Sequence, residues 1–236
     1  MPNLFSSDML ESVIRGLTPE QPVIRFVRTL PELQQVYHIT HECYVSSGYC
    51  APRPSGMVVH YPDFDHLPQS THLVALLEGK VVGAISLTED GPSGFTVDED
   101  FKKECDAIRQ EGKKVGTIWR LVVDESARSS RSVVIHMMKA MIELLLQENV
   151  STALMVVNPK HASVYKRMLN ATVVAQRDTT QGLSNAAAVL MRFEPDNLPA
   201  KSVLARDSGL TAIPDLILNS TFLHLFSPFK NAVFAF

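Results

Sequence analysis

One arginine stands in a strongly apolar stretch of the sequence, and its charge needs a partner. Arg120 lies within Thr117 to Val123, a nearly continuous run of large apolar residues. A buried guanidinium without a partner is very costly, so Arg120 must meet a carboxylate. Asp63 and Asp65 are candidates within the chain, and a bound acidic molecule is the other possibility. The sequence therefore predicts either a structural ion pair or a binding site for a carboxylate.

A run of hydroxyl and guanidinium side chains follows this stretch and leads into a helical pattern. Backbone N–H groups, hydroxyls and positive charge at a helix N-terminus can together bind a phosphate. Ordinary helix capping is the alternative interpretation. The run contains no glycine, so its backbone is poorly suited to close on a pyrophosphate. Its residues are Arg128, Ser129, Ser130, Arg131, Ser132 and Val133.

Metal-ligating residues gather in one third of the chain, but their spacing does not support a metal site. The paired spacing typical of structural zinc is missing, and Cys43 has an alternative place in a helix core. We therefore predict no bound metal. The residues are His38, His41, Cys43, Cys50, His60, His66 and His72.

Composition predicts one ordinary globular domain. The 236 residues are 45% hydrophobic and 20% charged, with a formal net charge of -3, so nucleic acid is not an expected partner. We find no signal sequence and no apolar stretch long enough to cross a membrane. Three cysteines leave at least one unpaired, which favours a cytoplasmic protein. We expect a lead-in over 1–21, a domain over 22–195 and an extension over 196–236 that packs or forms an oligomer contact.

Periodicity places these residues on an alternation of strands and helices. Apolar residues at helical spacing predict four helices, and short β-branched runs predict seven strands, two hairpins among them. This order indicates an α/β (α+β) fold with a mixed central sheet and helices on both faces. The segment from Val45 to Ser70 has no such pattern, and a loop of this length is usually a lid or binding loop. The expected strands are Val23–Val27, His72–Leu77, Val81–Leu87, Thr117–Val123, Ala153–Val157, Val173–Ala175 and Ala187–Phe193, and the expected helices begin near Pro31, Val97, Ser132 and Ala162.

Several short motifs resemble the core of the GNAT acyltransferases. They are Trp119 to Asp124, Arg128, Val156 to His161 and Tyr165 to Leu169. Within that superfamily the chain most resembles the long-chain N-acyl amino acid synthases, relatives of the acyl-homoserine lactone synthases. The order and spacing of Asp63-Phe64-Asp65, the Ala75 to Thr88 hairpin and Arg109 to Gly112 match that branch.

The resemblance implies a splayed sheet that accepts an acyl-pantetheine arm between two strands, here Trp119–Val123 and Ala153–Val157. It implies an acyl carrier protein as donor, with acyl-CoA as the less favoured thioester, and an amino acid or similar amine as acceptor. No permanently bound cofactor is expected. Asp63, Asp65 and Trp119 would then border the acceptor.

Aminolysis of a thioester needs a neutral amine, donors for the carbonyl oxyanion and an acid for the leaving thiolate. A strand that splays from its neighbour leaves N–H groups free, so the backbone at Leu121, Val122 and Val123 is the expected oxyanion donor. The resemblance places the general acid at Tyr165, although its ring could simply pack on the sheet. Asn158 either caps the helix after Pro159 or holds the pantetheine amides.

Departures from the family pattern keep other functions open. Related synthases tend to have Glu where this chain has Thr117, and lactone synthases have Arg where it has Ser86. Lactone production is therefore not expected. A coenzyme A-dependent GNAT N-acetyltransferase and an inactive module that binds an acyl group or a carrier protein are the alternatives. The predicted function is acyl transfer from a carrier thioester to an amine, with Tyr165 and Arg120 as catalytic residues.

Overall fold

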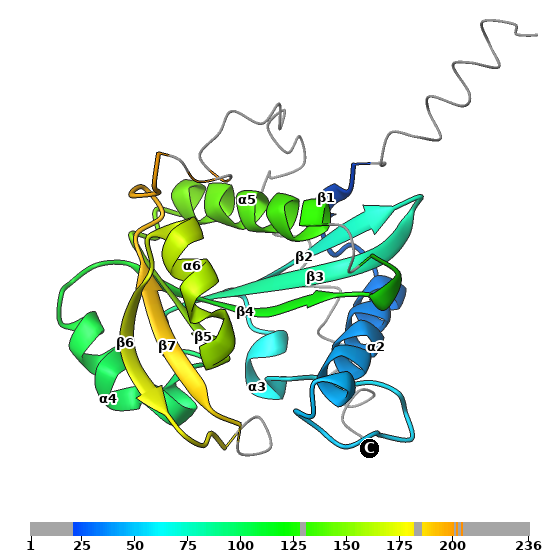
Figure 1. Ribbon diagram of the computed structural model, residues 1–236, viewed down its shortest axis with the longest axis horizontal. Helices are drawn as coiled ribbons and strands as arrows, with labels where there is room; N and C mark the ends of the chain where they lie inside the picture. Colours follow the sequence, from blue (N-terminus) through cyan, green and yellow to red (C-terminus); the bar gives the residue numbers. More distant parts are fainter. Residues whose placement is uncertain (1–20, 128–130, 182–185, 201, 203, 205–236) are drawn as a thin grey trace, which may run out of the picture.

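A sheet of seven strands forms the centre of this computed structural model (Figure 1). The structure describes residues 21–127, 131–181, 186–200, 202 and 204. β-Branched and apolar side chains dominate the strands, which favours extended backbone. The strands are β1 (Val23–Phe26), β2 (Ser70–Leu77), β3 (Lys80–Glu89), β4 (Val115–Val123), β5 (Thr152–Val157), β6 (Thr172–Arg177) and β7 (Ala188–Phe193).

The strand order is β1-β2-β3-β4-β5-β7-β6. Each neighbouring pair is antiparallel except β4 and β5, which are parallel. Two antiparallel parts of the sheet are thus joined through one parallel pair. The β2–β3 hairpin turns at Glu78 and Gly79, which both have positive φ, as a two-residue hairpin turn requires. The predicted mixed sheet and its two hairpins are confirmed.

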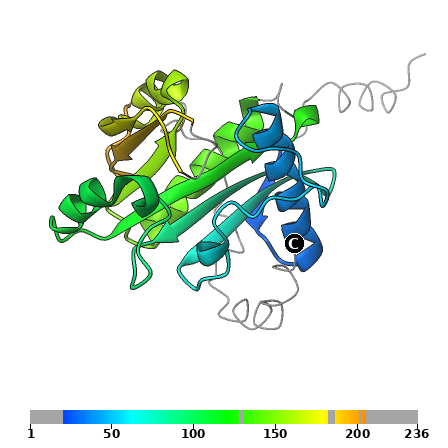
Figure 2. The same cartoon turned by 90° about the horizontal axis from the view of Figure 1, so that it is seen from below.

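Helices cover both faces of the sheet, as predicted (Figures 1 and 2). Successive residues of a strand point to opposite faces. In β2, Leu73 packs in the core cluster that contains Met137 of α5 (Arg131–Gln147). Its neighbour Val74 packs in the cluster that contains Val36 of α2 (Leu30–Ser46). The helices are α2 (Leu30–Ser46), α3 (Pro62–Asp65), α4 (Asp98–Arg109), α5 (Arg131–Gln147) and α6 (Ala162–Leu169).

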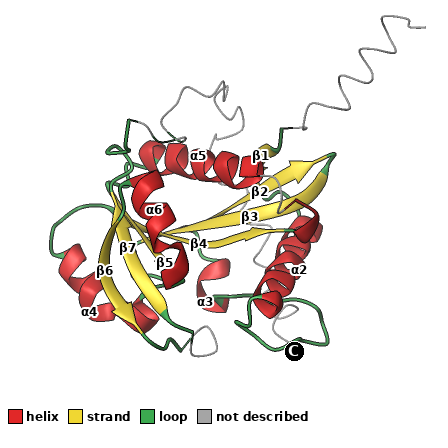
Figure 3. Ribbon diagram, in the orientation of Figure 1, coloured by secondary structure: helices red, strands yellow, loops and turns green. Residues whose placement is uncertain are grey.

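The predicted order of strands and helices is confirmed, with one addition (Figure 3). The segment predicted as a long loop contains the short helix α3, which starts at Pro62. Most of the predicted extension over 196–236, and with it the expected packing or oligomer contact, lies outside the described residues. Within the described ranges, none of the helices combines the length and the apolar character needed to span a membrane.

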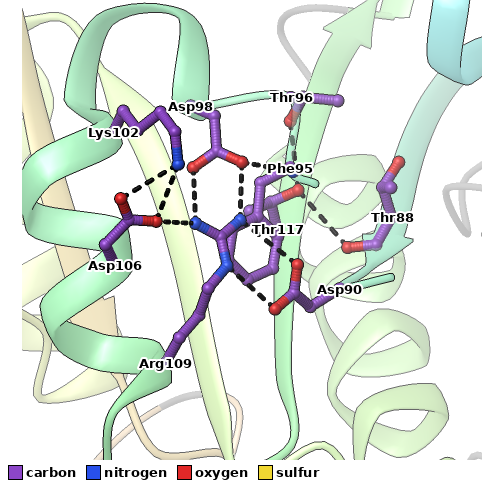
Figure 4. A network of polar contacts seen from close by, with 9 residues as sticks. All are labelled: Thr88, Asp90, Phe95, Thr96, Asp98, Lys102, Asp106, Arg109 and Thr117. Atoms are coloured by element: carbon purple, nitrogen blue, oxygen red, sulfur yellow. Dashed lines mark hydrogen bonds and ion pairs between the residues drawn. The ribbon is translucent and has the colours of Figure 1, made fainter. Parts of the chain in front are cut away.

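A partly exposed ionic cluster fixes the segment between β3 and α4 (Figure 4). The Arg109 guanidinium donates to Asp98 at 2.9 and 2.5 Å, to Asp106 at 2.7 Å and to Asp90 at 3.0 and 3.2 Å. It also lies over the Phe95 ring, with its central carbon 4.2 Å from the ring centroid. One cation thus ties three carboxylates of one loop and one helix together.

The same segment is hydrogen-bonded to the central strand. The hydroxyls of Thr96 and Thr117 are 3.0 Å apart, and the Thr117 hydroxyl also donates to the carbonyl of Thr88 at 3.3 Å. Thr117 is fully buried. The Thr117 hydroxyl therefore joins this loop to β3 and β4.

Gly94→Ala should destabilise the protein more than Gly112→Ala. Both glycines have positive φ (76° and 71°), so both substitutions carry a backbone strain of about 1–2 kcal/mol. A Cβ at Gly94 would lie 2.5 Å from Asp98 Oδ2, whereas a Cβ at Gly112 would meet nothing within 4 Å. We expect Gly94→Ala to cost at least about 1 kcal/mol more, because Asp98 must move away from Arg109. Equal free energies of unfolding in urea would contradict this account.

Candidate active site

The strands β4 and β5 separate halfway along their length. Their register runs from Val115 opposite Thr152 to Ile118 opposite Met155, and both strands continue past these residues. The β3–β4 pairing is irregular at the same height, between Ala84 and Ser86. The predicted splay between Trp119–Val123 and the end of β5 is therefore present.

Arg120 occupies this irregularity with a left-handed backbone, at φ 52°. Non-glycine residues rarely adopt positive φ, and such strain persists only where the surroundings enforce it. Its side chain is completely buried, with an exposed fraction of 0%. The strand bulge thus turns a charged side chain into the interior, beside the point where β4 and β5 part.

The Arg120 charge is balanced by Asp65 of α3. Arg120 Nη2 donates to Asp65 Oδ1, and the Tyr37 hydroxyl of α2 donates to Asp65 Oδ2. Burial by itself would raise the pKa of Asp65, but Arg120, His72 and the hydrogen bonds from Tyr37 and Arg120 together hold this pKa below its usual value. The carboxylate is therefore ionised at neutral pH. The predicted ion pair exists, and Asp65, not the exposed Asp63, is the partner.

His72 of β2 completes the cluster. Its Nε2 lies 2.8 Å from the carbonyl oxygen of Asp65, and its Nδ1 lies 2.9 Å from Ser86 Oγ. Burial lowers the pKa of His72, against the opposing charge of Asp65, so the ring is neutral at neutral pH. The carbonyl requires a donor, so Nε2 carries the proton and Nδ1 accepts from Ser86. Both ring nitrogens are engaged.

Two nitrogens of the Arg120 guanidinium, Nε and Nη1, have no hydrogen-bond partner among the described residues. The guanidinium carbon lies 4.3 Å from the Trp119 ring centroid and 5.4 Å from that of Tyr37. Trp119 itself is buried and donates from Nε1 to Thr88 Oγ1 at 3.0 Å. The aromatic faces stabilise the cation, while its unused donors point to a ligand that accepts hydrogen bonds.

A row of rings connects the two separating strands. The distance between ring centroids is 5.3 Å for Trp119 and Tyr61 and 3.9 Å for Tyr61 and His60. It is 5.0 Å for His60 and Tyr44 and 5.9 Å for Tyr44 and Tyr49. The Tyr49 hydroxyl then accepts a hydrogen bond of 3.2 Å from Asn158 Nδ2, at the end of β5. The segment predicted as a lid or binding loop thus supplies Tyr49, His60 and Tyr61 to a row of rings between β4 and β5.

Asn158 caps the turn that follows β5, which is one of its two predicted roles. Its Oδ1 accepts from the Lys160 backbone N–H at 3.1 Å, which caps the turn Pro159–His161. Its amide nitrogen faces Tyr49, as described above. The Oδ1 atom of Asn158 therefore serves as the cap, and its Nδ2 atom contacts the row of aromatic rings.

Tyr165 lies on α6, the helix that follows β5. Its half-buried ring packs against the core cluster that contains the buried methionines of α5. Burial raises the pKa of its hydroxyl. Leu121 is half-buried and Val122 and Val123 are buried on β4. Leu121, Val122 and Val123 lie in the part of β4 that continues beyond its last pair with β5, whereas Asp63 does not join the buried cluster.

The predicted phosphate segment is described only in part. Arg128, Ser129 and Ser130 lie outside the described residues. Arg131 is exposed at the start of α5, Val133 is buried in the core, and the Ser132 hydroxyl lies 3.1 Å from His136 Nδ1 of the same helix.

His38 and His41 each form a hydrogen bond within the chain. His38 Nδ1 lies 2.8 Å from the carbonyl of Gly56, and His41 Nε2 accepts from the Arg53 N–H at 2.9 Å. Over the described ranges, no three His, Cys, Asp or Glu side chains are grouped so that they could hold a metal ion.

Five residues of this region were missed by sequence reasoning: Tyr37, Tyr44, His60, Tyr61 and His72. Tyr37 follows the apolar spacing of its helix, which predicts only a core position. Tyr44 and Tyr61 border a segment without periodicity, so no pattern orients their rings. The only available signal was the density of aromatic and histidine residues between 37 and 72.

Comparison with known proteins gives a family and a fold. Residues 35–194, more than half of the chain, match the family of the N-acyl amino acid synthase FeeM. No curated protein matches the chain. The structure of FeeM, an N-acyl amino acid synthase from uncultured soil microbes, is similar with a TM-score of 0.68 and 22% identity, over 78% of this chain and 97% of that one.

Two acyl-homoserine lactone synthases share the fold at lower similarity. LasI has a TM-score of 0.57 and 12% identity, over 77% of this chain and 94% of its own. The coenzyme A-dependent synthase BjaI has a TM-score of 0.51 and 16% identity, over 72% and 83%. The GNAT-like fold expected from the motifs is thereby confirmed. The chain belongs to the FeeM family of N-acyl amino acid synthases and is an N-acyltransferase.

Proposed function

We propose that this protein transfers an acyl group from an acyl-carrier-protein thioester to the amine of an amino acid, in the gap between β4 and β5. The observation that carries the proposal is the separation of the two strands beyond Ile118 and Met155, directly beside the buried Arg120. A separated strand pair offers both space and unpaired backbone groups to an extended ligand. The pantetheine arm would lie along Trp119–Val123 on one side and the end of β5 on the other.

The acceptor's carboxylate would bind to Arg120. The guanidinium has already neutralised Asp65, yet Nε and Nη1 remain buried without a partner among the described residues. Leaving such donors unpaired is costly, and a carboxylate would satisfy both. Asp65 and Trp119 would then border the acceptor, and the exposed Asp63 would lie at the rim of the site.

The reaction itself requires no protein nucleophile. The amine nitrogen attacks the thioester carbon, and the carbonyl oxygen becomes an oxyanion that the backbone N–H groups of Leu121 to Val123 would stabilise. The C–S bond then breaks, and the departing thiolate takes the proton of the Tyr165 hydroxyl. Raised by burial, the pKa of Tyr165 keeps this hydroxyl protonated until the thiolate forms.

The phosphate of the donor would bind at the start of α5. Arg131 is exposed there, and Arg128, Ser129, Ser130 and Ser132 are its neighbours in the sequence. Asn158 would hold the pantetheine amides at the end of β5. A single phosphate on a carrier protein needs fewer backbone donors than a pyrophosphate, so the absence of glycine from 128 to 133 supports a carrier-bound donor.

Free coenzyme A should therefore bind weakly, with a dissociation constant on the order of 1 mM. Calorimetry with coenzyme A and with the matched acyl-carrier thioester measures the difference directly, and the thioester should bind far more tightly. Arg131→Ala serves as the comparison variant for the phosphate contact. Low-micromolar binding of coenzyme A that is lost in Arg131→Ala would instead support a coenzyme A-dependent N-acyltransferase.

Turnover tests the proposal as a whole. Purified protein is incubated with carrier thioesters of several acyl lengths and with a panel of amino acids and simple amines, and the products are identified by mass spectrometry. We expect N-acyl amino acids, with little product from amines that lack a carboxylate. Thioester binding without any product would indicate an inactive carrier-binding module.

A further inference from the structure

Aminolysis leaves a proton on the nitrogen that some group must remove. Around the gap, the acceptors already described are occupied: Asp65 accepts through both carboxylate oxygens, from Arg120 and from Tyr37. His72 uses both ring nitrogens, toward Ser86 and the Asp65 carbonyl. Neither side chain can accept a further proton without breaking the buried cluster.

His60 is different, because its ring makes only aromatic contacts within the described part of the chain. It lies 3.9 Å from Tyr61, 5.0 Å from Tyr44 and 6.3 Å from Trp119, measured between ring centroids. Trp119 is the first β4 residue beyond the last β4–β5 pair. The imidazole of His60 therefore lies near the β4 residue at which the two strands separate, and one of its ring nitrogens carries a lone pair.

We propose that His60 is the general base of the reaction and takes the proton from the acceptor nitrogen as the new C–N bond forms. This assignment rests on the proposed reaction in the β4–β5 gap. The acceptor arrives as a neutral amine and attacks the thioester carbon. One N–H proton passes to the imidazole, the C–S bond breaks, and the thiolate is protonated by Tyr165. The imidazolium then returns its proton to water, and the Tyr165 phenolate takes a proton back from water, so that both side chains regain their starting states.

The charge state of His60 suits this role. Burial, with the charge of Arg120, lowers its pKa to about 3, against the opposing effect of Asp65. The ring is thus neutral throughout the physiological range and is always able to accept a proton. So weak a base could not deprotonate a free ammonium ion. It can accept a proton from the tetrahedral intermediate, because that nitrogen becomes much more acidic as the C–S bond breaks.

The neighbouring groups do not compete for this proton. Burial raises the pKa values of Tyr44 and Tyr61, so both phenols stay protonated and act as donors. Arg120 is a cation, and Asp65 is held ionised within the buried cluster. None of these neighbouring side chains therefore has a free basic lone pair, whereas the imidazole of His60 does.

His60→Gln separates proton transfer from hydrogen bonding, since its amide oxygen accepts a hydrogen bond but is not basic. We expect kcat for the carrier thioester and amino acid to fall on the order of 30-fold, below the roughly 100- to 10,000-fold of stronger general bases, while the acceptor KM changes little. His38→Ala is the matched control, because it removes a contact to Gly56 in the same segment. It should retain nearly the full kcat.

Chemical rescue distinguishes a base from a packing residue. Imidazole should restore turnover to His60→Ala, whereas pyrazole, which has the same size but is a much weaker base, should restore far less. Equal rescue by both molecules, or a kcat of His60→Gln equal to that of the wild-type protein, would overturn the assignment of His60 alone. A wild-type protein that acylates no amine would overturn the proposed function, and the assignment with it.

Discussion

Replacing Arg120 with methionine should lower the free energy of unfolding by about 3–5 kcal/mol. The substitution keeps most of the apolar volume but leaves Asp65 ionised and buried, with only Tyr37 and His72 near it. Its carboxylate would then have to be protonated or to draw in water. Urea denaturation at neutral pH measures the loss.

Two control variants show whether burial is the cause. Arg120→Met combined with Asp65→Asn should be more stable than Arg120→Met alone, because no buried charge is left unpaired. Lys102→Met breaks the ion pair between Lys102 and Asp106, which are 2.9 Å apart, and the Lys102 side chain is 68% exposed. This variant should lower the free energy of unfolding by no more than about 0.5 kcal/mol. If Arg120→Met were as mild as Lys102→Met, the buried pair would have no structural role.

The Tyr165→Phe variant should slow acyl transfer about 100-fold without changing the melting temperature. General acids contribute about 100- to 10,000-fold, and we expect the low end because a thiolate is a good leaving group that water can also protonate. The ring, which packs on the core below α5, is unchanged. The measurement is the single-turnover rate with saturating carrier thioester and amino acid, alongside a thermal melt.

The leaving group provides the control for Tyr165. A donor thioester with a more acidic thiol needs less help from a general acid. The ratio of the wild-type rate to the Tyr165→Phe rate should therefore be smaller with such a donor. An unchanged rate with the natural thioester would assign the ring to packing alone. If the ratio of these two rates were the same for all thiols, the hydroxyl would act at another step.

Most of the sheet and its helices could be predicted because their residues bury one side at regular spacing. The near-continuous apolar run from Thr117 to Val123 predicted a strand, and every residue of β4 except Leu121 is buried. The helical spacing after Ser132 predicted a helix, and α5 buries Met137, Met138 and Met141 completely. The helix α3 was missed because its four residues, Pro62 to Asp65, are too few for a period to appear.

The site could be predicted only where chemistry demanded a partner. A guanidinium in an apolar strand required a carboxylate, which limited the choice to Asp63, Asp65 or a ligand. Sequence could not choose between them, because the choice depends on how α3 lies across β4. The ring row of Tyr44, His60 and Tyr61 followed from no local rule, since each contact joins residues that the backbone brings together only in three dimensions.

The parallel junction between β4 and β5 has a further consequence for how the molecule unfolds. The antiparallel parts β1–β4 and β5–β7 are each built from neighbouring or nearly neighbouring strands, yet they meet through only four residue pairs. A pantetheine arm in the gap would contact both parts at once. Binding to the native state alone adds to its stability. The donor substrate would therefore act as a removable cross-link between two halves of one sheet.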